Sequence, residues 1–361
     1  MNDANELISF IASMSGEGNL RVDENLGEGY VRLRVSEAER RQAKHDIQHV
    51  EDIVIEMLRN ARDAGADKVY LATTKEEGVR TLLFLDNGSG VPQDMQERIF
   101  DARVTSKLES MKMDRWGVHG RGMALFSIKQ NTDEARVVSS GVDLGSSFKV
   151  RVATERLGER ADQSSWPQAV KDEDGRYVCA RGPHNIIRAA CEFALEELRC
   201  CDVYLGSPSE IAATLYAQAS SRLDTSRLLF IDDECELPVI DRLGLASDAE
   251  DFIRICSGLG LEMSERTAHR ILSGQIKPVR GVTARLLRER DSTSHAPAPI
   301  DLAKDRRGLR IAKDDMAQFS RAVERDFNDL AARYYLNLCG DPKIRVSRDR
   351  ITVTFDLAKE E

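Results

Sequence analysis

The sequence has no long uninterrupted hydrophobic run, and its cysteines lack the spacing of a metal or disulfide framework. A membrane-spanning helix, which needs about 20 apolar residues, is therefore not predicted. The first residues, Met-Asn-Asp-Ala-Asn-Glu, are acidic and lack the basic start of a secretory signal. The seven cysteines are an odd number without a Cys-x-x-Cys pair, which favours a reducing, cytoplasmic location.

The composition is that of a globular protein with a real core. The chain has 361 residues, enough for two or three domains, and 41% of them are hydrophobic. The net charge of -9 argues against non-specific binding to nucleic acid, although a local basic patch could still bind it.

The periodicity of the first half predicts helices and paired strands in alternation. A helix is expected from Ser36 to Ala64, broken or bent around 44–48, and a short one over 95–99. Strands are expected over 30–35, 68–73, 79–85, 135–139 and 147–152. Strands that form hairpins and are separated by helices predict an α+β sandwich rather than a doubly wound sheet.

The end of the predicted long helix carries an unusual polar face. Glu56, Asn60 and Asp63 are spaced at i, i+4 and i+7, so they share one side, which Ile53 extends by one turn. Polar groups on a core-facing helix surface need partners. Taken alone, the run also fits an ordinary capped helix end.

Two glycine-containing stretches follow. Asp86-Asn-Gly-Ser-Gly90 ends the strand over 79–85, which places a carboxylate beside a backbone that a flat ligand can approach closely, although Asn-Gly is also common in simple turns. Gly117-Val-His-Gly120-Arg-Gly122 leads into an apolar helical run, and exposed amides at a helix start favour anions. No Gly-Lys-Ser/Thr follows, so the stretch is not a Walker A loop.

These motifs, in this order, resemble those of the GHKL (Bergerat-fold) ATPases, and within that superfamily most closely MutL and the type IIB topoisomerase B subunits. The boxes are Glu56–Ala66, Asp86–Gly90, Gly117–Gly122 and Gly145-Ser146-Ser147, with serine where threonine is usual. The resemblance covers about a third of the chain. It implies a Bergerat-fold α/β sandwich, a mixed and mostly antiparallel sheet with helices on one face, which binds ATP and Mg²⁺.

The resemblance also implies a role for each residue. Glu56 would polarise the attacking water as general base, and Asn60 would hold Mg²⁺. Asp63 would orient the site, and Asp86 would accept a hydrogen bond from the adenine amino group. The remaining implied nucleotide-binding residues are Gly88, Gly90, Thr105, Lys107, Gly117, His119, Gly120, Arg121, Gly122 and Ser146. Of these, His119 and Arg121 would face either a phosphate or solvent.

The second half predicts a helix over 184–199, a strand over 202–205, a helix over 208–219 and a strand over 228–231, with 155–182 as loop. Three short helices over 249–290 resemble the helix-two-turns-helix insert of type IIB topoisomerase B subunits, or an ordinary helix-turn-helix. Their basic side chains predict contact with DNA phosphates, with a solvated helix face as the alternative. The candidates are Arg266, Arg270, Lys277, Arg280, Arg285 and Arg288.

The predicted domains are an N-terminal arm (1–40), the ATP-binding domain (41–235), the helical insert (236–291) and a linker with a C-terminal helix over 314–338 and hairpin over 344–355 (292–361). In the resembling families a lysine of a later domain reaches the γ-phosphate; Lys304, Lys313 or Lys343 would be the candidate here.

The expected function is an ATPase that dimerises on binding Mg-ATP and acts in DNA topology or repair. No nuclease signature stands out, so DNA cleavage would need a separate effector subunit. The alternatives are a chaperone-like protein-remodelling ATPase and a histidine-kinase-like nucleotide-binding signalling protein. No membrane partner is expected.

Overall fold

The computed structural model describes residues 22–106, 112–114, 116–119, 122–160, 162–198, 200–222, 233–291, 313–331, 336–340, 342–346 and 351–359. The chain divides into two compact units, Met1–Asp291 and Ser292–Glu361. The predicted strand over 228–231 lies outside the described residues.

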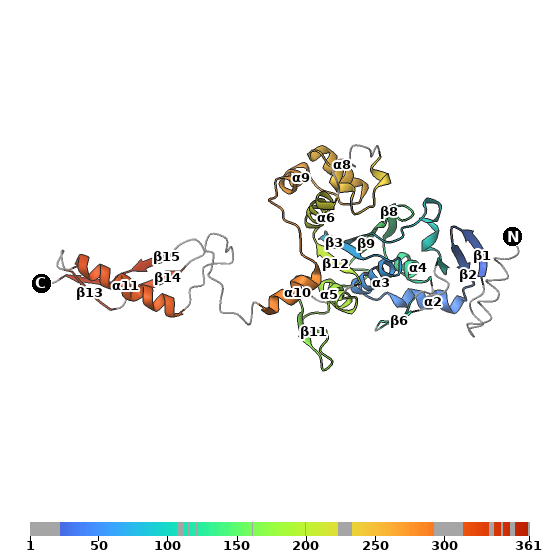
Figure 1. Cartoon of the computed structure of the whole chain (residues 1–361). Helices are drawn as coiled ribbons and strands as arrows, with labels where there is room; N and C mark the ends of the chain where they lie inside the picture. Colours follow the sequence, from blue (N-terminus) through green and yellow to red (C-terminus); the bar gives the residue numbers. More distant parts are fainter. Residues whose placement is uncertain are drawn as a thin grey trace. The chain divides into compact units, whose positions relative to one another are not determined.

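A five-stranded sheet forms the centre of the first unit, in the order β12-β3-β4-β9-β8 (Figure 1). Its strands are β3 (Lys68–Glu76), β4 (Val79–Asp86), β8 (Glu134–Ser140), β9 (Ser146–Ala153) and β12 (Asp202–Gly206). β12 pairs with β3 in parallel, and the other neighbours are antiparallel. The predicted α+β class and the mixed, mostly antiparallel sheet are confirmed.

The central strand β4 is buried on both faces. Leu82 and Phe84 belong to one hydrophobic core, which we call the first core, and Leu83 and Leu85 belong to a second core on the opposite face. Successive residues of a strand point to opposite faces, so a continuous apolar run can serve two cores at once. Asp86 is the last residue of this strand and is buried like the residues before it.

Helices cover both faces of the sheet, so the prediction of helices on one face only is wrong. The first core contains residues of α3 (Val50–Asp63), α4 (Ala124–Asn131), α5 (Ile186–Glu196) and α10 (Val282–Asp291). The second core contains residues of α6 (Pro208–Arg222), α8 (Ala249–Gly258) and α9 (Glu265–Leu272). The three helices predicted over 249–290 are therefore present, but α10 packs on a different face from α8 and α9.

The N-terminal segment packs beside the sheet. β1 (Val22–Gly27) pairs with β2 (Tyr30–Leu33), and β2 pairs with β5 (Val104–Thr105). Ser36 caps α2 (Glu37–Asp46), and Glu39 completes the capping box. The helix predicted over 36–64 was expected to be broken or bent, and it is broken, because α2 ends at Asp46 and α3 begins after His49.

Short elements differ most from the prediction. Two 3₁₀ turns, η1 (Gln93–Met95) and η2 (Arg98–Phe100), replace the helix predicted over 95–99, and η3 (Glu234–Glu236) and η4 (Arg242–Leu245) precede α8. The segment predicted as loop over 155–182 contains the hairpin β10 (Gln168–Lys171) and β11 (Tyr177–Arg181). β6 (Lys112–Asp114) and β7 (Gly117–His119) form another hairpin.

The second unit contains α11 (Lys313–Ala331) and two small antiparallel pairs. β13 (Leu336–Leu338) pairs with β16 (Leu357–Lys359), and β14 (Lys343–Val346) pairs with β15 (Ile351–Thr354). The predicted hairpin over 344–355 corresponds to β14 and β15, but the helix predicted to reach residue 338 is wrong at 336–338, which are strand.

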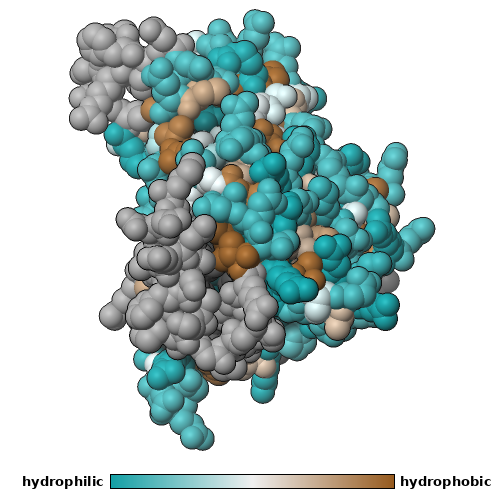
Figure 2. Space-filling model, turned by 90° about the vertical axis from the view of Figure 1, so that its right-hand side faces the viewer, coloured by the Kyte–Doolittle hydropathy of each residue, from teal (hydrophilic) through white to brown (hydrophobic). Residues whose placement is uncertain are grey.

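The part of the chain that the structure describes contains no helix with the length and apolar character that a bilayer crossing requires. The face drawn in Figure 2 is mostly hydrophilic, and hydrophobic residues appear on it as small separate areas.

Candidate nucleotide-binding site

A cavity of about 560 Å³ lies at one end of the central strands, between α3, β5 and the start of α4. Its wall brings together residues that are widely separated in the sequence. Those predicted from the motifs are Glu56, Asn60, Asp63, Asp86, Gly90, Thr105, Gly122 and Ser146.

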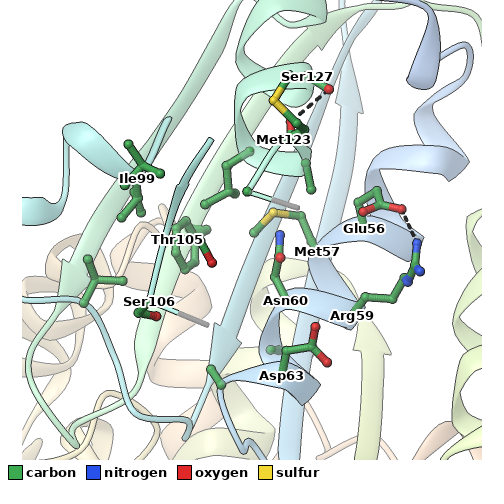
Figure 3. A pocket seen from close by; sticks show the side chains of 18 of the residues that line it. Glu56, Met57, Arg59, Asn60, Asp63, Ile99, Thr105, Ser106, Met123 and Ser127 are labelled. Carbon is green, nitrogen blue, oxygen red and sulfur yellow. Dashed lines mark hydrogen bonds and ion pairs between the residues drawn. The ribbon is translucent and has the colours of Figure 1, made fainter. Parts of the chain in front are cut away.

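The helix α3 supplies the polar wall of this cavity. Its start is fixed by Asp52, whose carboxylate accepts hydrogen bonds from the amides of Gln48 and His49. Figure 3 shows Glu56, Asn60 and Asp63 along one side of the helix, with Thr105 across the cavity. The side-chain nitrogen of Asn60 is buried without a hydrogen-bond partner among the described residues. A buried polar atom without a partner is costly, so this amide is suited to a ligand.

The floor of the cavity is formed by the ends of β4 and β9. Asp86 is 4% exposed, and its Oδ1 accepts a hydrogen bond of 2.8 Å from the amide of Gly88. Ser146 lies opposite Asp86 in the sheet register. The Ser146 hydroxyl is 3.0 Å from that of Ser140, which also accepts from the amide of Val91 at 2.8 Å. Ser140 is a supporting residue that no motif indicated.

Glycines are required where three backbone segments meet. A Cβ on Gly88 would lie 2.9 Å from the Cβ of Ala64 at the end of α3. Gly90 has a φ of +69°, and its Cβ would lie 1.9 Å from the carbonyl oxygen of Gly141. The backbone amide of Asp143 donates a hydrogen bond of 2.7 Å to the carbonyl oxygen of Ser89, which joins the same two loops. The Asp86–Gly90 loop is therefore held closely against α3 and the loop before β9.

The phosphate side of the predicted site is described in part. Gly122 has a φ of +66°, its carbonyl accepts from the amide of Arg103 at 2.8 Å, and α4 begins just after it. Gly117 and His119 lie in β7. The predicted residues Lys107, Gly120 and Arg121 lie outside the described residues.

A buried ionic cluster beside Glu56 was not predicted. Arg59, 2% exposed, contacts Glu56 at 2.6 Å and Asp114 of β6 at 3.0 Å. Arg62 contacts the same Asp114 oxygen at 3.2 Å, as well as Asp63 at 3.0 Å and Glu197 at 2.9 Å. Burial lowers the pKa of Arg62, but the three carboxylates raise it by more than burial lowers it. The net shift of the pKa is therefore upward. The motif pattern contains both arginines, but it gives no sign of their distant partners.

The N-terminal segment also contributes to the cavity, which the predicted arm did not indicate. Tyr30, Glu39, Gln42 and Asp46 line it. Glu39 forms an ion pair with Arg103. Burial raises the pKa of Tyr30, and Asp94 adds to this, while a hydrogen bond with Ser106 opposes it. These contacts fix β2 and α2 against the β5 side of the cavity.

The basic residues predicted to contact DNA are divided between two places. Arg266 and Arg270 on α9, with Lys277 and Arg280 after it, are exposed on the side of the second core. Arg285 on α10 lies on the side of the first core, and its guanidinium stacks on Trp166 at 3.8 Å. The side chain of Arg288 is outside the described part of the structure.

The C-terminal lysines can be placed only within their own unit. Lys313 begins α11, Lys343 pairs with Asp356 at 2.6 Å, and Lys304 lies outside the described residues.

The fold is an α/β sandwich with a polar cavity at one end of its central strands. Residues 47–160 match the family model of the histidine kinase-, DNA gyrase B- and HSP90-like ATPases. Similar curated proteins include the DNA mismatch repair protein MutL of Staphylococcus aureus strains Newman, JH1 and Mu3, each 28% identical over 136 residues. The match covers 35% of this chain and 20% of each relative, so the chain matches about a fifth of their length. Residues 47–160 therefore carry a domain of the GHKL ATPase type, and about a third of the chain is similar to MutL.

Proposed function

We propose that this chain binds Mg-ATP in the cavity beside α3 and hydrolyses it. The observation that carries the proposal is that the Glu56 carboxylate, the Asn60 amide and the buried Asp86 carboxylate line one cavity. The cavity volume of about 560 Å³ suits a ligand of nucleotide size.

Each group has a chemical task in this proposal. Glu56 takes a proton from the attacking water, because a carboxylate next to the γ-phosphate can act as general base. Asp86 accepts a hydrogen bond from the adenine amino group, and its own bond from the Gly88 amide fixes the carboxylate. Lys107 and the backbone amides of the stretch from Gly117 to Gly122 are proposed to contact the phosphates.

The residues present fit a magnesium ion held jointly with the nucleotide. Asn60 offers a side-chain amide whose nitrogen is unpartnered among the described residues, so the amide can turn its oxygen toward a cation. Bound Mg²⁺ would neutralise the phosphate charge that develops during transfer. The described residues contain no group of three or more His, Cys, Asp or Glu suited to a metal, which agrees with a site completed by phosphates.

The test combines nucleotide binding and turnover. Glu56→Ala should bind an ATP analogue like the wild type while phosphate release falls to background. Asp86→Asn should weaken binding itself, since the amide presents a donor to the adenine amino group. Glu262→Ala, which removes an exposed carboxylate paired with Lys149, is the matched control and should change neither property. Failure of the wild type to bind any ATP analogue would refute the proposal.

We further propose that nucleotide binding drives dimerisation and that the dimer acts on DNA with a separate effector subunit. The relatives' name, DNA mismatch repair protein, and the exposed Arg266 and Arg270 on α9 support the DNA part. Light scattering with and without a non-hydrolysable analogue tests dimerisation. A dimer that forms without DNA affinity would favour the chaperone-like alternative, and nucleotide binding without turnover would favour the signalling alternative.

The DNA part has its own measurement. If Arg266 and Arg270 each contact a phosphate, the double variant Arg266→Glu/Arg270→Glu should reduce the slope of log affinity against log salt by about 2. Arg285→Glu serves as a comparison, because Arg285 is already stacked on Trp166. If the affinity for DNA changes neither with salt concentration nor with charge reversal, this interface is excluded.

The unpaired state of all seven cysteines supports a reducing, cytoplasmic location.

A further inference from the structure

The carboxylate proposed as the general base has a buried arginine as its neighbour. Arg59 Nη1 lies 2.6 Å from Glu56 Oε1, one turn further along α3 (Figure 3). The Arg59 side chain is 3% exposed, whereas that of Glu56 is 21% exposed. Both residues line the cavity, and the Glu56 side chain is the more exposed of the two.

The orientation of Arg59 is fixed from its other side by β6. Arg59 Nε lies 3.0 Å from Asp114 Oδ2. A guanidinium is planar and rigid, so a carboxylate that holds Nε also sets the direction of Nη1. Glu56 and Asp114 thus contact different nitrogens of one guanidinium.

Asp114 is itself held at both of its oxygens. Oδ2 also contacts Arg62 Nη1 at 3.2 Å, and Oδ1 accepts the backbone amide of Trp116 at 3.0 Å. Trp116 lines the cavity and lies 6.2 Å from the ring of Phe193 on α5. The position of the β6–β7 hairpin is in this way tied to α3 and α5 through charged groups and one aromatic contact.

We propose that Arg59 is a positioning residue for Glu56, and that Asp114 couples the placement of the β6–β7 hairpin to the orientation of that carboxylate. The inference rests on the proposed ATP hydrolysis and adds a route by which the β6–β7 hairpin, which contains Gly117, influences the rate of hydrolysis. Burying ionic groups costs desolvation free energy that attraction only partly returns, so an ion pair beside a reacting carboxylate is more readily explained by function than by stability.

A purely structural role makes a different prediction. If the cluster only stabilised the fold, its loss would lower stability and change binding and turnover together, or neither. If Arg59 orients Glu56, its loss removes an interaction that matters for the reaction step, so kcat falls while the KM for ATP stays nearly constant.

The experiment compares Arg59→Met, Arg59→Lys and Asp114→Asn in the full chain, using ATP turnover, analogue affinity and urea unfolding. Arg59→Met should lower kcat by about 10- to 100-fold, within the range of general-base effects, with analogue affinity within about threefold of wild type. Arg59→Lys should recover only part of the lost kcat. The lysine keeps the positive charge, but its ammonium group lacks the planar fork with which the guanidinium contacts two carboxylates. Asp114→Asn should lower kcat by about 3- to 10-fold through weaker orientation of Arg59.

The matched control is Arg80→Met. Arg80 is also buried and ion-paired, with Glu159 at 2.6 Å, but it lies on β4 away from the end that carries Asp86. It should lose stability without a specific loss of kcat. Unchanged kcat in both Arg59 variants, or a rise in kcat, would overturn the inference. If Arg59→Met does not fold, the kcat values of Arg59→Lys and Asp114→Asn test the inference in the same way. A wild type that binds nucleotide without turnover would instead refute the proposed function.

Discussion

Replacing Gly90 by alanine should disable the nucleotide site by displacing one loop. The new Cβ would lie 1.9 Å from the Gly141 carbonyl oxygen, so the two loops must separate by roughly 1.5 Å to reach an ordinary contact. Such a shift would disturb the hydrogen bonds from Asp143 to Ser89 (2.7 Å) and from Gly145 to Gly88 (3.0 Å). These bonds contribute about 1 kcal/mol each, and a left-handed backbone costs alanine about 1–2 kcal/mol. The expected loss of unfolding free energy is about 3–4 kcal/mol.

A second glycine separates the steric part from the backbone part. Gly78 has a φ of +79°, but a Cβ there would meet nothing within 4 Å. Gly78→Ala should therefore cost only about 1–2 kcal/mol and leave nucleotide binding unchanged. Urea unfolding followed by tryptophan fluorescence suits both variants, because the chain's two tryptophans, Trp116 and Trp166, lie in the first unit. Equal destabilisation in the two variants, or normal nucleotide affinity in Gly90→Ala, would refute the reasoning.

Other expected outcomes follow from charge and burial. Burial raises the pKa of Glu159, but ion pairs with an arginine and a lysine outweigh it and hold the pKa below its usual value, so Glu159→Gln should lose about 1–2 kcal/mol at pH 7. That loss should shrink as the pH falls below about 4 in pH-dependent urea titrations, and a pH-independent loss would contradict it. Burial raises the pKa of Cys201 to about 12, and nearby carboxylates add to it, so at pH 8 a thiol reagent followed by peptide mapping should label exposed Cys200 and not Cys201. Arg285→Ala should alter the fluorescence of Trp166 and cost about 0.5–2 kcal/mol, whereas an unchanged spectrum would argue against the stacking.

The sequence was most informative where local pattern and chemistry coincide. The helical spacing of Glu56, Asn60 and Asp63 correctly placed three polar groups on one face, which the structure directs at the cavity. The apolar run of β4 predicted a strand, and Asp86 at its end lines the same cavity. Such features depend on a single element and its period, so the sequence alone can indicate them.

Contacts between distant segments could not be predicted in this way. Asp114 lies 55 residues from Arg59, and no periodicity connects them. Ser140 supports Ser146 only because β8 and β9 are neighbours. The early end of α11 was missed because local propensity marks element boundaries poorly, while tertiary contacts decide them.

The two-sided burial of β4 also governs where the chain can tolerate a change of length. One residue inserted within β4 would exchange its two faces, so that Leu82 and Phe84 would face the second core and Asp86 would leave its place opposite Ser146. An insertion in the turn at Glu77-Gly78 would leave the pairing of β3 with β4 in register. Insertions and deletions should therefore be found in this turn and excluded from the strand, where a single added residue would disrupt both cores and the nucleotide site together.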